Sequence, residues 1–260
     1  MDQADEKSSE FTEDVIYDGR LTMFQPRAGF RFALDSLLLG SFARVKPGQR
    51  VIDLGTGVGV IALTLALRMG QGLIFAVEIQ SRLADCARRN VKKNDQSSIV
   101  KVLETDWTDL TLARLNGPVD HVICNPPYRE LGAGRLSPAR EETIARHELK
   151  GGLPDTAQIA AELLTPRGLF SIIYPAARLT TALSQLRAIK LEPKRLRLVH
   201  TRPEKRARLA LIEARLQGGE ELEVIPPLII YEHQEIYSPE AEAIFLGKDL
   251  ARQEVKPDSF

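Results

Sequence analysis

A glycine-rich turn between a short apolar segment and a longer apolar helical pattern most constrains the fold of this chain. Residues 51–54 read Val-Ile-Asp-Leu, the turn Gly55–Gly59 reads Gly-Thr-Gly-Val-Gly, and residues 60–69 repeat apolar side chains at helical spacing. Glycines adopt backbone angles that other residues avoid, and they let a ligand approach the main chain closely. The pattern predicts a strand, a ligand-binding turn and a helix, which together form the repeating unit of an open α/β sheet.

Two classes of ligand fit such a turn. One is a dinucleotide, and Glu78, at the end of the predicted strand 73–78, suits a ribose in either class. However, Val60 stands where the dinucleotide fingerprint has its third glycine or alanine, and Asp53 places a carboxylate where a pyrophosphate is disfavoured. An acid at this point favours a ligand with a cationic amine, such as S-adenosylmethionine.

A second motif, Asn125-Pro126-Pro127-Tyr128, follows the apolar run Val119–Cys124. Its place at the carboxyl end of a predicted strand puts its side chains where ligands bind in an open α/β sheet. The first proline favours an extended Asn125, and two fixed φ angles in succession restrict where the Tyr128 ring lies. An amide, two rigid residues and an aromatic ring indicate a clamp for a flat substrate.

Apolar runs and helical patterns alternate along the chain, which predicts a doubly wound sheet. We expect strands at 50–54, 73–78, 99–104, 119–124 and 168–174, helices at 58–69, 81–93, near 108–115, 154–164 and 178–189, and an antiparallel C-terminal hairpin with strands 196–201 and 207–216. A short N-terminal β-hairpin is predicted around Asp18-Gly19, followed by a helix at 36–43 with Asp35 as its cap or as a ligand. The expected organisation is a tail, hairpin and helix over 1–45, a catalytic domain over 46–220 and an extension over 221–260.

The order of these motifs resembles that of class I S-adenosylmethionine-dependent amino-methyltransferases, which implies a Rossmann-like α/β fold with a seven-stranded sheet. The segments Gln25–Asp35 and Ala145–Glu148 are similar to the bacterial family that methylates the exocyclic amine of the adenine just 3′ to the anticodon in valine tRNA. The resemblance covers roughly residues 15 to 215. It implies S-adenosyl-L-methionine as cofactor and tRNA as partner.

The resemblance also implies roles for individual residues. In the catalytic motif, the Asn125 side-chain oxygen and the Pro126 carbonyl accept hydrogen bonds from the target amine, and Tyr128 stacks on the base. In the cofactor site, Glu78 accepts from the ribose hydroxyls, Ile79 lies against the adenine, and Asp106 accepts from the adenine amine beside Trp107. The turn residues Asp53, Gly55, Thr56 and Gly57, together with Asn125, complete that site. For Asp106-Trp107, a helix cap followed by a core aromatic stays an alternative.

Substrate contacts are expected from Arg31, His147 and a basic segment. From Arg178 to Arg215 there are eleven lysines or arginines against three glutamates, and Arg202, Lys205 and Arg206 fall on the turn of the predicted C-terminal hairpin. A basic loop tip favours a track for the RNA backbone, whereas a solvated hairpin face is the alternative. Arg31 alternatively covers the N-terminal hairpin, and His147 is expected to be structural or to touch the substrate, because amine methylation needs no base before attack.

Composition adds few constraints. The formal net charge is zero, and the 260 residues suffice for one α/β domain. No apolar run reaches the about 20 residues that a membrane span needs, and no charged-then-apolar leader opens the chain, so we expect a cytoplasmic protein. Cys86 and Cys124 lie in apolar patterns and are expected in the core, and four scattered histidines suggest no metal site. Nothing distinguishes a monomer from a homodimer.

Three functions remain open from the sequence. The first is methylation of an adenine amine in RNA. The second is methylation of a glutamine side-chain amide in a protein such as a release factor, because that amide is also a flat NH2 group. Related protein methyltransferases carry a helical N-terminal domain, which the predicted N-terminal hairpin does not match. The third is a binding module without activity, against which the intact Asn125–Tyr128 motif argues.

Overall fold

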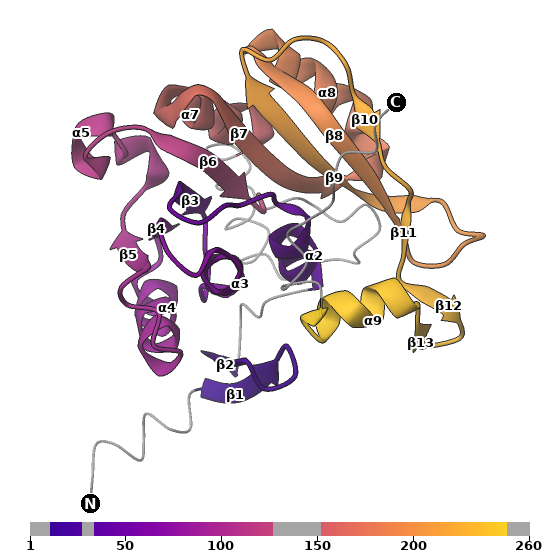
Figure 1. Cartoon of the computed structure of the whole chain (residues 1–260), viewed down its shortest axis with the longest axis horizontal. Coiled ribbons are helices and arrows are strands. Elements are labelled where there is room, and N and C mark those ends of the chain that lie inside the picture. The colour runs from indigo at the N-terminus through magenta and orange to yellow at the C-terminus, as the bar shows by residue number, and fades with distance from the viewer. Residues whose placement is uncertain (1–10, 28–33, 127–151, 249–260) are drawn as a thin grey trace, which may run out of the picture.

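The computed structural model describes residues 11–27, 34–126 and 152–248. A central mixed sheet runs through the molecule with helices on both faces (Figure 1). Its strands, in chain order, are β3 (Arg50–Leu54), β4 (Leu73–Glu78), β5 (Val100–Glu104), β6 (Val119–Cys124), β7 (Leu164–Pro175), β8 (Leu191–His200), β9 (Ala207–Leu216), β10 (Glu223–Val224) and β11 (Leu228–Ile229). The helices are α2 (Leu34–Phe42), α3 (Val60–Met69), α4 (Ser81–Lys93), α5 (Leu112–Leu115), α7 (Leu153–Leu163), α8 (Leu179–Ala188) and α9 (Pro239–Phe245), with 3₁₀ turns at Trp107–Asp109 and Ala176–Arg178.

The strand order confirms the doubly wound sheet. The seven long strands lie in the order β5-β4-β3-β6-β7-β9-β8, and β9 is antiparallel to both of its neighbours. The two-residue strands β10 and β11 add to the edge at β8, which extends the expected seven strands to nine. The chain therefore reverses direction across the sheet between β3 and β6, which is where ligands bind in open α/β folds.

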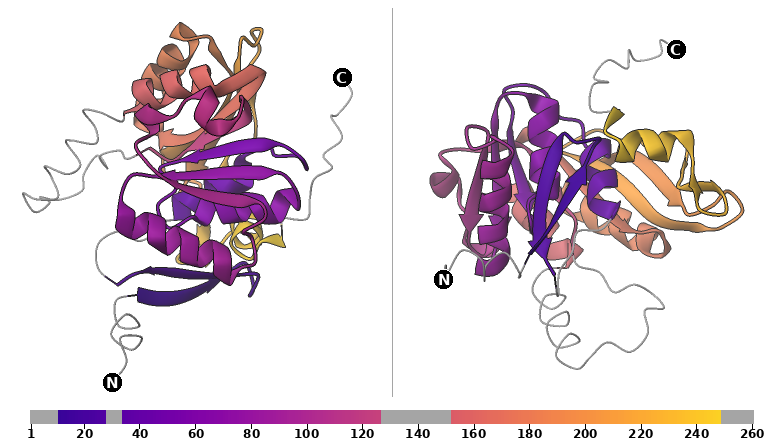
Figure 2. Two further views of the ribbon diagram at one scale, coloured as in Figure 1. Left: turned by 90° about the vertical axis from the view of Figure 1, so that its left-hand side faces the viewer. Right: turned by 90° about the horizontal axis from the view of Figure 1, so that it is seen from below.

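Both faces of the sheet are apolar, and each is covered by its own set of helices. In β3, Val51 belongs to the cluster with α2, α3 and α4, whereas Ile52 and Leu54 belong to the cluster with α5, α7 and α8. This two-residue period is the reason why a nearly continuous apolar run folds as a buried strand here. The left-hand view of Figure 2 shows helices above and below the strands of the sheet.

The N-terminal hairpin, formed by β1 (Phe11–Ile16) and β2 (Leu21–Pro26), packs against α3 and α4. The Tyr17 hydroxyl is buried and lies 3.0 Å from Thr64 Oγ1 of α3. On the open edge of β2, the side-chain amides of Asn90 and Asn94 bond to both N–H and C=O of Phe24 and Thr22, at 2.7 to 2.9 Å. Two asparagines one helical turn apart thus pair with β2 as a neighbouring strand would.

Asparagine 90 also reaches the glycine-rich turn. Its side chain is fully buried, and its Nδ2 donates to the carbonyl of Val58 at 2.9 Å as well as to Phe24. The helix α2 that follows the hairpin is anchored to α3, because the Arg68 guanidinium donates to the carbonyls of Gly40 and Ala43. The predicted N-terminal cap at Asp35 is wrong, since α2 already includes Leu34 and Asp35 lies in its first turn.

The C-terminal segment packs against α2, on the same face of the sheet as α3 and α4. It forms a small hairpin of β12 (Tyr231–His233) and β13 (Ile236–Tyr237), and then α9, which lies near α2 in Figure 1. The Ser238 hydroxyl accepts from Ala241 N at 3.1 Å and Pro239 occupies the first turn, a combination that begins a helix. Ala241 and Ile244 of α9 join the same apolar cluster as Leu37 and Leu38.

Candidate active site

The candidate site lies where the parallel strands β3, β4, β5 and β6 end. The glycine turn follows β3, Glu78 ends β4, Asp106 follows β5 and Asn125 follows β6. These strands are paired in register and parallel, so their carboxyl ends share one edge of the sheet. Motifs that are far apart in sequence, such as the glycine turn and Asn125, therefore converge on that edge.

The glycine turn is held by main-chain contacts that need left-handed backbone. Gly55, Gly57 and Gly59 have φ values of 70°, 58° and 90°. Thr56 N donates to Val77 O and Gly59 N donates to Thr56 O, each at 2.9 Å. A side chain at any of the three positions would be strained in this conformation, and a Cβ at Gly59 would lie 3.5 Å from Ala87 Cβ of α4.

Asp53 lies beneath the turn rather than on its surface. Its side chain has no exposed area, and its Oδ2 accepts from the Thr56 hydroxyl and from Ala62 N at 3.2 Å. Its Oδ1 is buried without a hydrogen-bond partner among the residues that the structure describes. Burial raises the pKa of Asp53 to about 7, against the lowering effect of the bonds from Thr56 and Ala62. One oxygen of Asp53 thus fixes the turn, and the other is buried without a partner among the described residues.

The pKa of Asp53 predicts a pH-dependent stability. A raised native-state pKa means that the native state binds this proton more tightly than the unfolded chain, whose aspartates titrate near 3.9. The stabilising contribution is therefore complete below about pH 4 and is lost as the pH rises toward about 7. Asp53→Asn is the reference, because its amide oxygen still accepts from Thr56 and Ala62 but does not titrate. The wild type should lose up to about 1.4 kcal/mol of unfolding free energy per pH unit in that window relative to this variant.

Urea unfolding of both proteins at pH 5, 6, 7 and 8 measures this difference. Above pH 8 the two curves should run parallel, because Asp53 is then ionised in both the native and the unfolded state. A difference that stays constant from pH 5 to pH 8 would contradict the raised pKa.

Glu78 is the second buried acid of the edge. It is 5% exposed, its Oε2 accepts from Gly57 N at 3.0 Å, and its Oε1 accepts from Gln80 N at 2.9 Å. Each carboxylate oxygen has two lone pairs and can accept from more than one donor. Beside it, Ile79 is 49% exposed, which is unusual for an isoleucine at the end of a buried strand.

Asp106 caps a short helical turn, and Trp107 lies beside the glycine turn. Asp106 Oδ1 accepts from Thr108 N at 2.9 Å and so caps the 3₁₀ turn Trp107–Asp109. The Trp107 ring borders the glycine turn, because a Cβ at Gly55 would lie 3.5 Å from its Cζ3 atom. The cap that the sequence left as an alternative is confirmed. The role of Asp106 toward a cofactor stays a prediction.

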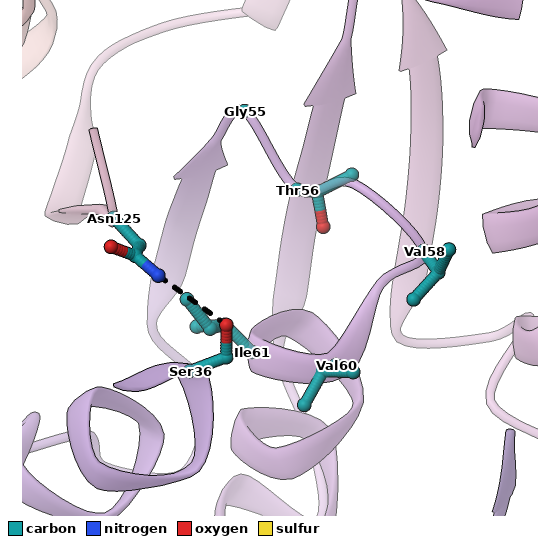
Figure 3. A pocket seen from close by; sticks show the side chains of 7 residues that line it. All are labelled: Ser36, Gly55, Thr56, Val58, Val60, Ile61 and Asn125. Atoms are coloured by element: carbon teal, nitrogen blue, oxygen red, sulfur yellow. Dashed lines mark hydrogen bonds between the residues drawn. The ribbon is translucent and has the colours of Figure 1, made fainter. Parts of the chain in front are cut away.

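Asn125 faces a small hollow between the sheet and two helices. The hollow is lined by Ser36, Gly55, Thr56, Val58, Val60, Ile61 and Asn125 (Figure 3). Asn125 Nδ2 donates to Ser36 Oγ at 3.4 Å, and the next residue, Pro126, is buried. Ser36 did not enter the sequence prediction, although a serine within the apolar helix Leu34–Phe42 was a detectable signal. Tyr128, Arg31 and His147 lie outside the described residues.

The sequence is similar to those of known proteins. The model of the methyltransferase small domain family matches residues 34–146. A tRNA1(Val) (adenine(37)-N6)-methyltransferase from Porphyromonas gingivalis is 32% identical over 236 residues, which cover 87% of this chain and 91% of that protein. The chain belongs to this methyltransferase family. A relative of the same name from Shewanella frigidimarina is 31% identical over 169 residues, covering 64% of this chain and 66% of the relative.

Solved structures show the same fold for this methyltransferase family member. A protein from Agrobacterium tumefaciens, described as a predicted O-methyltransferase, superposes with a TM-score of 0.65 at 24% identity, over 82% of this chain and 96% of that one. TYW2 from M. jannaschii in complex with AdoMet superposes with a TM-score of 0.53 at 14% identity, over 79% and 85% of the two chains. These matches confirm the predicted class I methyltransferase architecture, and the family confirms the predicted enzyme class.

The cations of the basic segment that precede the loop at 202–206 have partners within the protein. Lys194 donates to the carbonyls of Gly219 and Glu220 at 3.1 and 2.9 Å. Arg195 pairs with the buried Glu213 at 3.4 Å, and Arg197 pairs with Glu240 of α9 at 2.6 Å. These three cations bind β8 to neighbouring parts of the chain. The predicted substrate contacts in this segment, Arg202, Lys205 and Arg206, lie in the loop itself.

Within that loop, the arginine at 202 differs from the two later cations. Arg202 is half-buried and donates to Gln234 O at 2.8 Å, which ties the loop to the β12–β13 hairpin. Lys205 and Arg206 are exposed, and their side chains make no ion pair within the described part of the chain. β8 is parallel to β7 and β6, so the loop lies at the same edge of the sheet as Asn125.

The remaining expectations concern metals, cysteines and membranes. The described residues contain no cluster of three or more histidines, cysteines or acids that is suited to a metal ion. Cys86 and Cys124 are both buried and free, as predicted. No helix among the described segments is long and apolar enough to cross a membrane.

Proposed function

We propose that this chain transfers a methyl group from S-adenosylmethionine to the exocyclic amine of an adenine in tRNA, next to the anticodon. The observation that supports it most is the convergence of Asn125 with the glycine turn at the β3–β6 switch point. The relatives' name, tRNA1(Val) (adenine(37)-N6)-methyltransferase, supports the substrate and its position. The described N-terminal residues form a β-hairpin, unlike the helical domain expected of a glutamine methyltransferase.

The edge of the sheet fits the cofactor. Asp53 keeps a buried oxygen without a partner among the described residues beneath the turn, and the Glu78 carboxylate accepts from Gly57 N of the same turn. We assign Glu78 to the ribose hydroxyls, Ile79 and Trp107 to the two faces of the adenine, and Asp106 to its amine. The main chain of Gly55, Thr56 and Gly57 would line the methionine portion. When bound, S-adenosylmethionine supplies a methyl group already activated by a sulfonium, so no metal is required.

The catalytic residues act on the amine. Its nitrogen is a poor nucleophile because the lone pair is delocalised into the ring. Asn125 Oδ1 and Pro126 O would accept from its two N–H groups and favour a pyramidal nitrogen. These bonds strengthen as positive charge develops on nitrogen, so they stabilise the transition state more than the ground state. The nitrogen would form the new bond to the methyl carbon, the electron pair of the carbon–sulfur bond would pass to sulfur, and one N–H proton would pass to solvent.

The substrate contacts come from elements around this edge. We assign Tyr128 to stacking on an unstacked base, and Lys205, Arg206 and Arg202 to phosphates, with Arg31 and His147 as further contacts. The loop lies three strand spacings from Asn125, roughly 15 Å along the edge. That distance suits a nucleic acid whose target base enters the hollow while its backbone continues over β8.

The direct test offers the enzyme a choice of substrates. Labelled S-adenosylmethionine is incubated with unmodified total tRNA or with release factors, followed by nucleoside and peptide mass spectrometry. We expect N6-methyladenosine in tRNA and no label in protein. Label on a glutamine would establish the protein substrate instead, and no transfer to either would contradict the proposal.

The loop cations predict a salt effect on tRNA binding. Lys205→Ala with Arg206→Ala should make the plot of log affinity against log salt shallower by about one to two, since each phosphate contact contributes about 0.7 to 0.9 to the slope. Cofactor affinity should not change. Titration of unmodified tRNA at several salt concentrations measures the slope.

A matched control exists on α4. Lys92 and Lys93 are adjacent, exposed and in the last turn of that helix, which puts them at the opposite edge of the sheet. Lys92→Ala with Lys93→Ala removes the same charge and should leave the slope unchanged. Equal slopes for the two double variants would show that the loop is a solvated surface.

A further inference from the structure

Ser36 is the polar side chain that touches Asn125. It lies in the first turn of α2, is 9% exposed, and is followed by the buried residues Leu37, Leu38 and Leu39. A buried hydroxyl in apolar surroundings needs a hydrogen-bond partner. Its oxygen receives the Asn125 Nδ2 donor at 3.4 Å, across 89 positions of sequence. This contact joins a helix of the N-terminal region to the catalytic motif.

The two ends of the Asn125 amide are chemically opposite. The proposed methylation requires the Asn125 oxygen, which is an acceptor, to face the amine. If the amide nitrogen faced the amine instead, N–H donors would meet N–H donors. In Figure 3 the Asn125 nitrogen points toward Ser36, and its oxygen points to the other side. Occupation of the nitrogen by a protein acceptor therefore leaves the oxygen for the substrate.

The helix that carries Ser36, α2, is packed closely against α3. A Cβ at Gly40 would lie 3.0 Å from Thr64 Cγ2, so α2 and α3 approach closely at that point. Arg68 of α3 bonds to the carbonyls of Gly40 and Ala43 at the end of α2. Because α3 begins at the glycine turn, Ser36 is fixed in the same frame as the cofactor residues.

We infer that Ser36 is a positioning residue that holds the Asn125 amide in its productive orientation. The inference rests on the proposed function of Asn125. Ser36 contacts neither methyl donor nor amine in this assignment, and it acts through Asn125 alone. A loss of Ser36 therefore lowers the fraction of enzyme with the oxygen toward the substrate.

A double-mutant cycle tests the inference. Single-turnover rates are measured at saturating cofactor and tRNA for the wild type, Ser36→Ala, Asn125→Ala and the double variant. Ser36→Ala should lower the rate about tenfold, in line with the loss of one neutral hydrogen bond. In the Asn125→Ala background it should have no further effect, because the group that it positions is gone.

Further measurements separate positioning from a structural role. Calorimetry should give the same cofactor affinity for Ser36→Ala within about twofold, and its thermal midpoint should stay near that of the wild type, since alanine favours helix. Ser36→Thr retains the hydroxyl and should restore most of the rate.

The outcomes are distinguishable. A wild-type rate for Ser36→Ala, a Ser36→Thr rate as low as that of Ser36→Ala, or an equal tenfold loss in the Asn125→Ala background would overturn the inference about Ser36. A wild-type rate for Asn125→Ala would instead overturn the proposed mechanism, whatever Ser36 does.

Discussion

Asn125→Ala is expected to lower the single-turnover rate of methyl transfer by about 10² to 10³. Asn125 stands at the end of β6 beside the hollow, and in the proposed mechanism its oxygen accepts a bond that strengthens as the amine becomes positively charged. Removal of an interaction made mainly in the transition state lowers the rate without weakening ground-state binding. Rapid-quench methylation of unmodified tRNA, with enzyme in excess, measures the step directly.

The cofactor affinity of this variant is the internal control, because Asn125 is assigned mainly to the amine. Calorimetry should give an affinity close to that of the wild type. Gln158→Ala removes an amide from the exposed face of α7, where Gln158 bonds to Glu162 at 2.8 Å, and should keep the full rate. A near wild-type rate for Asn125→Ala would rule out the amide as a source of transition-state stabilisation.

Local patterns predicted the sheet well because buried strands depend on their own residues. The bounds expected for β4, α4 and β6 agree with the structure, and each combines an apolar run or helical repeat with a clear stop. The glycine turn was equally local, since its left-handed glycines are required wherever the strand meets α3. The edge of the sheet that holds the site followed from strand order, which the alternation of elements implies.

Contacts between distant segments could not be predicted from those patterns. Lys194, Arg195 and Arg197 bond to residues that lie 18 to 43 positions further along the chain. Periodic patterns describe neighbouring residues, so they carry no signal for such pairs. Ser36 shows the same limit, because a serine in an apolar helix is detectable but its partner lies 89 positions away.

Asp53 shows another limit of sequence analysis, which gives the residue type but not the depth of its side chain. Its assignment to the cofactor site stays a prediction, and its side chain is fully buried and does not line the hollow. Its oxygen Oδ2 fixes Thr56 and Ala62, so its first task is to hold the turn. Asp53 would therefore act on the cofactor in one of two ways. Its buried Oδ1 would accept a hydrogen bond, or its charge would attract the cationic amine, although its pKa of about 7 leaves it only partly ionised at neutral pH.

Glu78→Ala should weaken S-adenosylmethionine binding roughly ten- to a hundredfold, because charge-assisted hydrogen bonds contribute about 1.5 to 3 kcal/mol. Two effects act together. The ribose hydroxyls lose their proposed acceptor, and Gly57 N and Gln80 N lose the carboxylate that fixes the turn. Isothermal calorimetry with the cofactor alone measures the sum.

Glu78→Gln separates the two effects. A glutamine keeps one acceptor oxygen and nearly the same shape, but its nitrogen is a donor and replaces one of the two oxygens that accept from Gly57 N and Gln80 N. Its affinity should fall between those of the wild type and Glu78→Ala. Asp106→Ala gives the comparison at the proposed adenine end, where Oδ1 already caps a 3₁₀ turn. An unchanged affinity in Glu78→Ala would remove Glu78 from the cofactor site. Tighter binding of a nicotinamide dinucleotide than of S-adenosylmethionine would assign the glycine turn to the dinucleotide class.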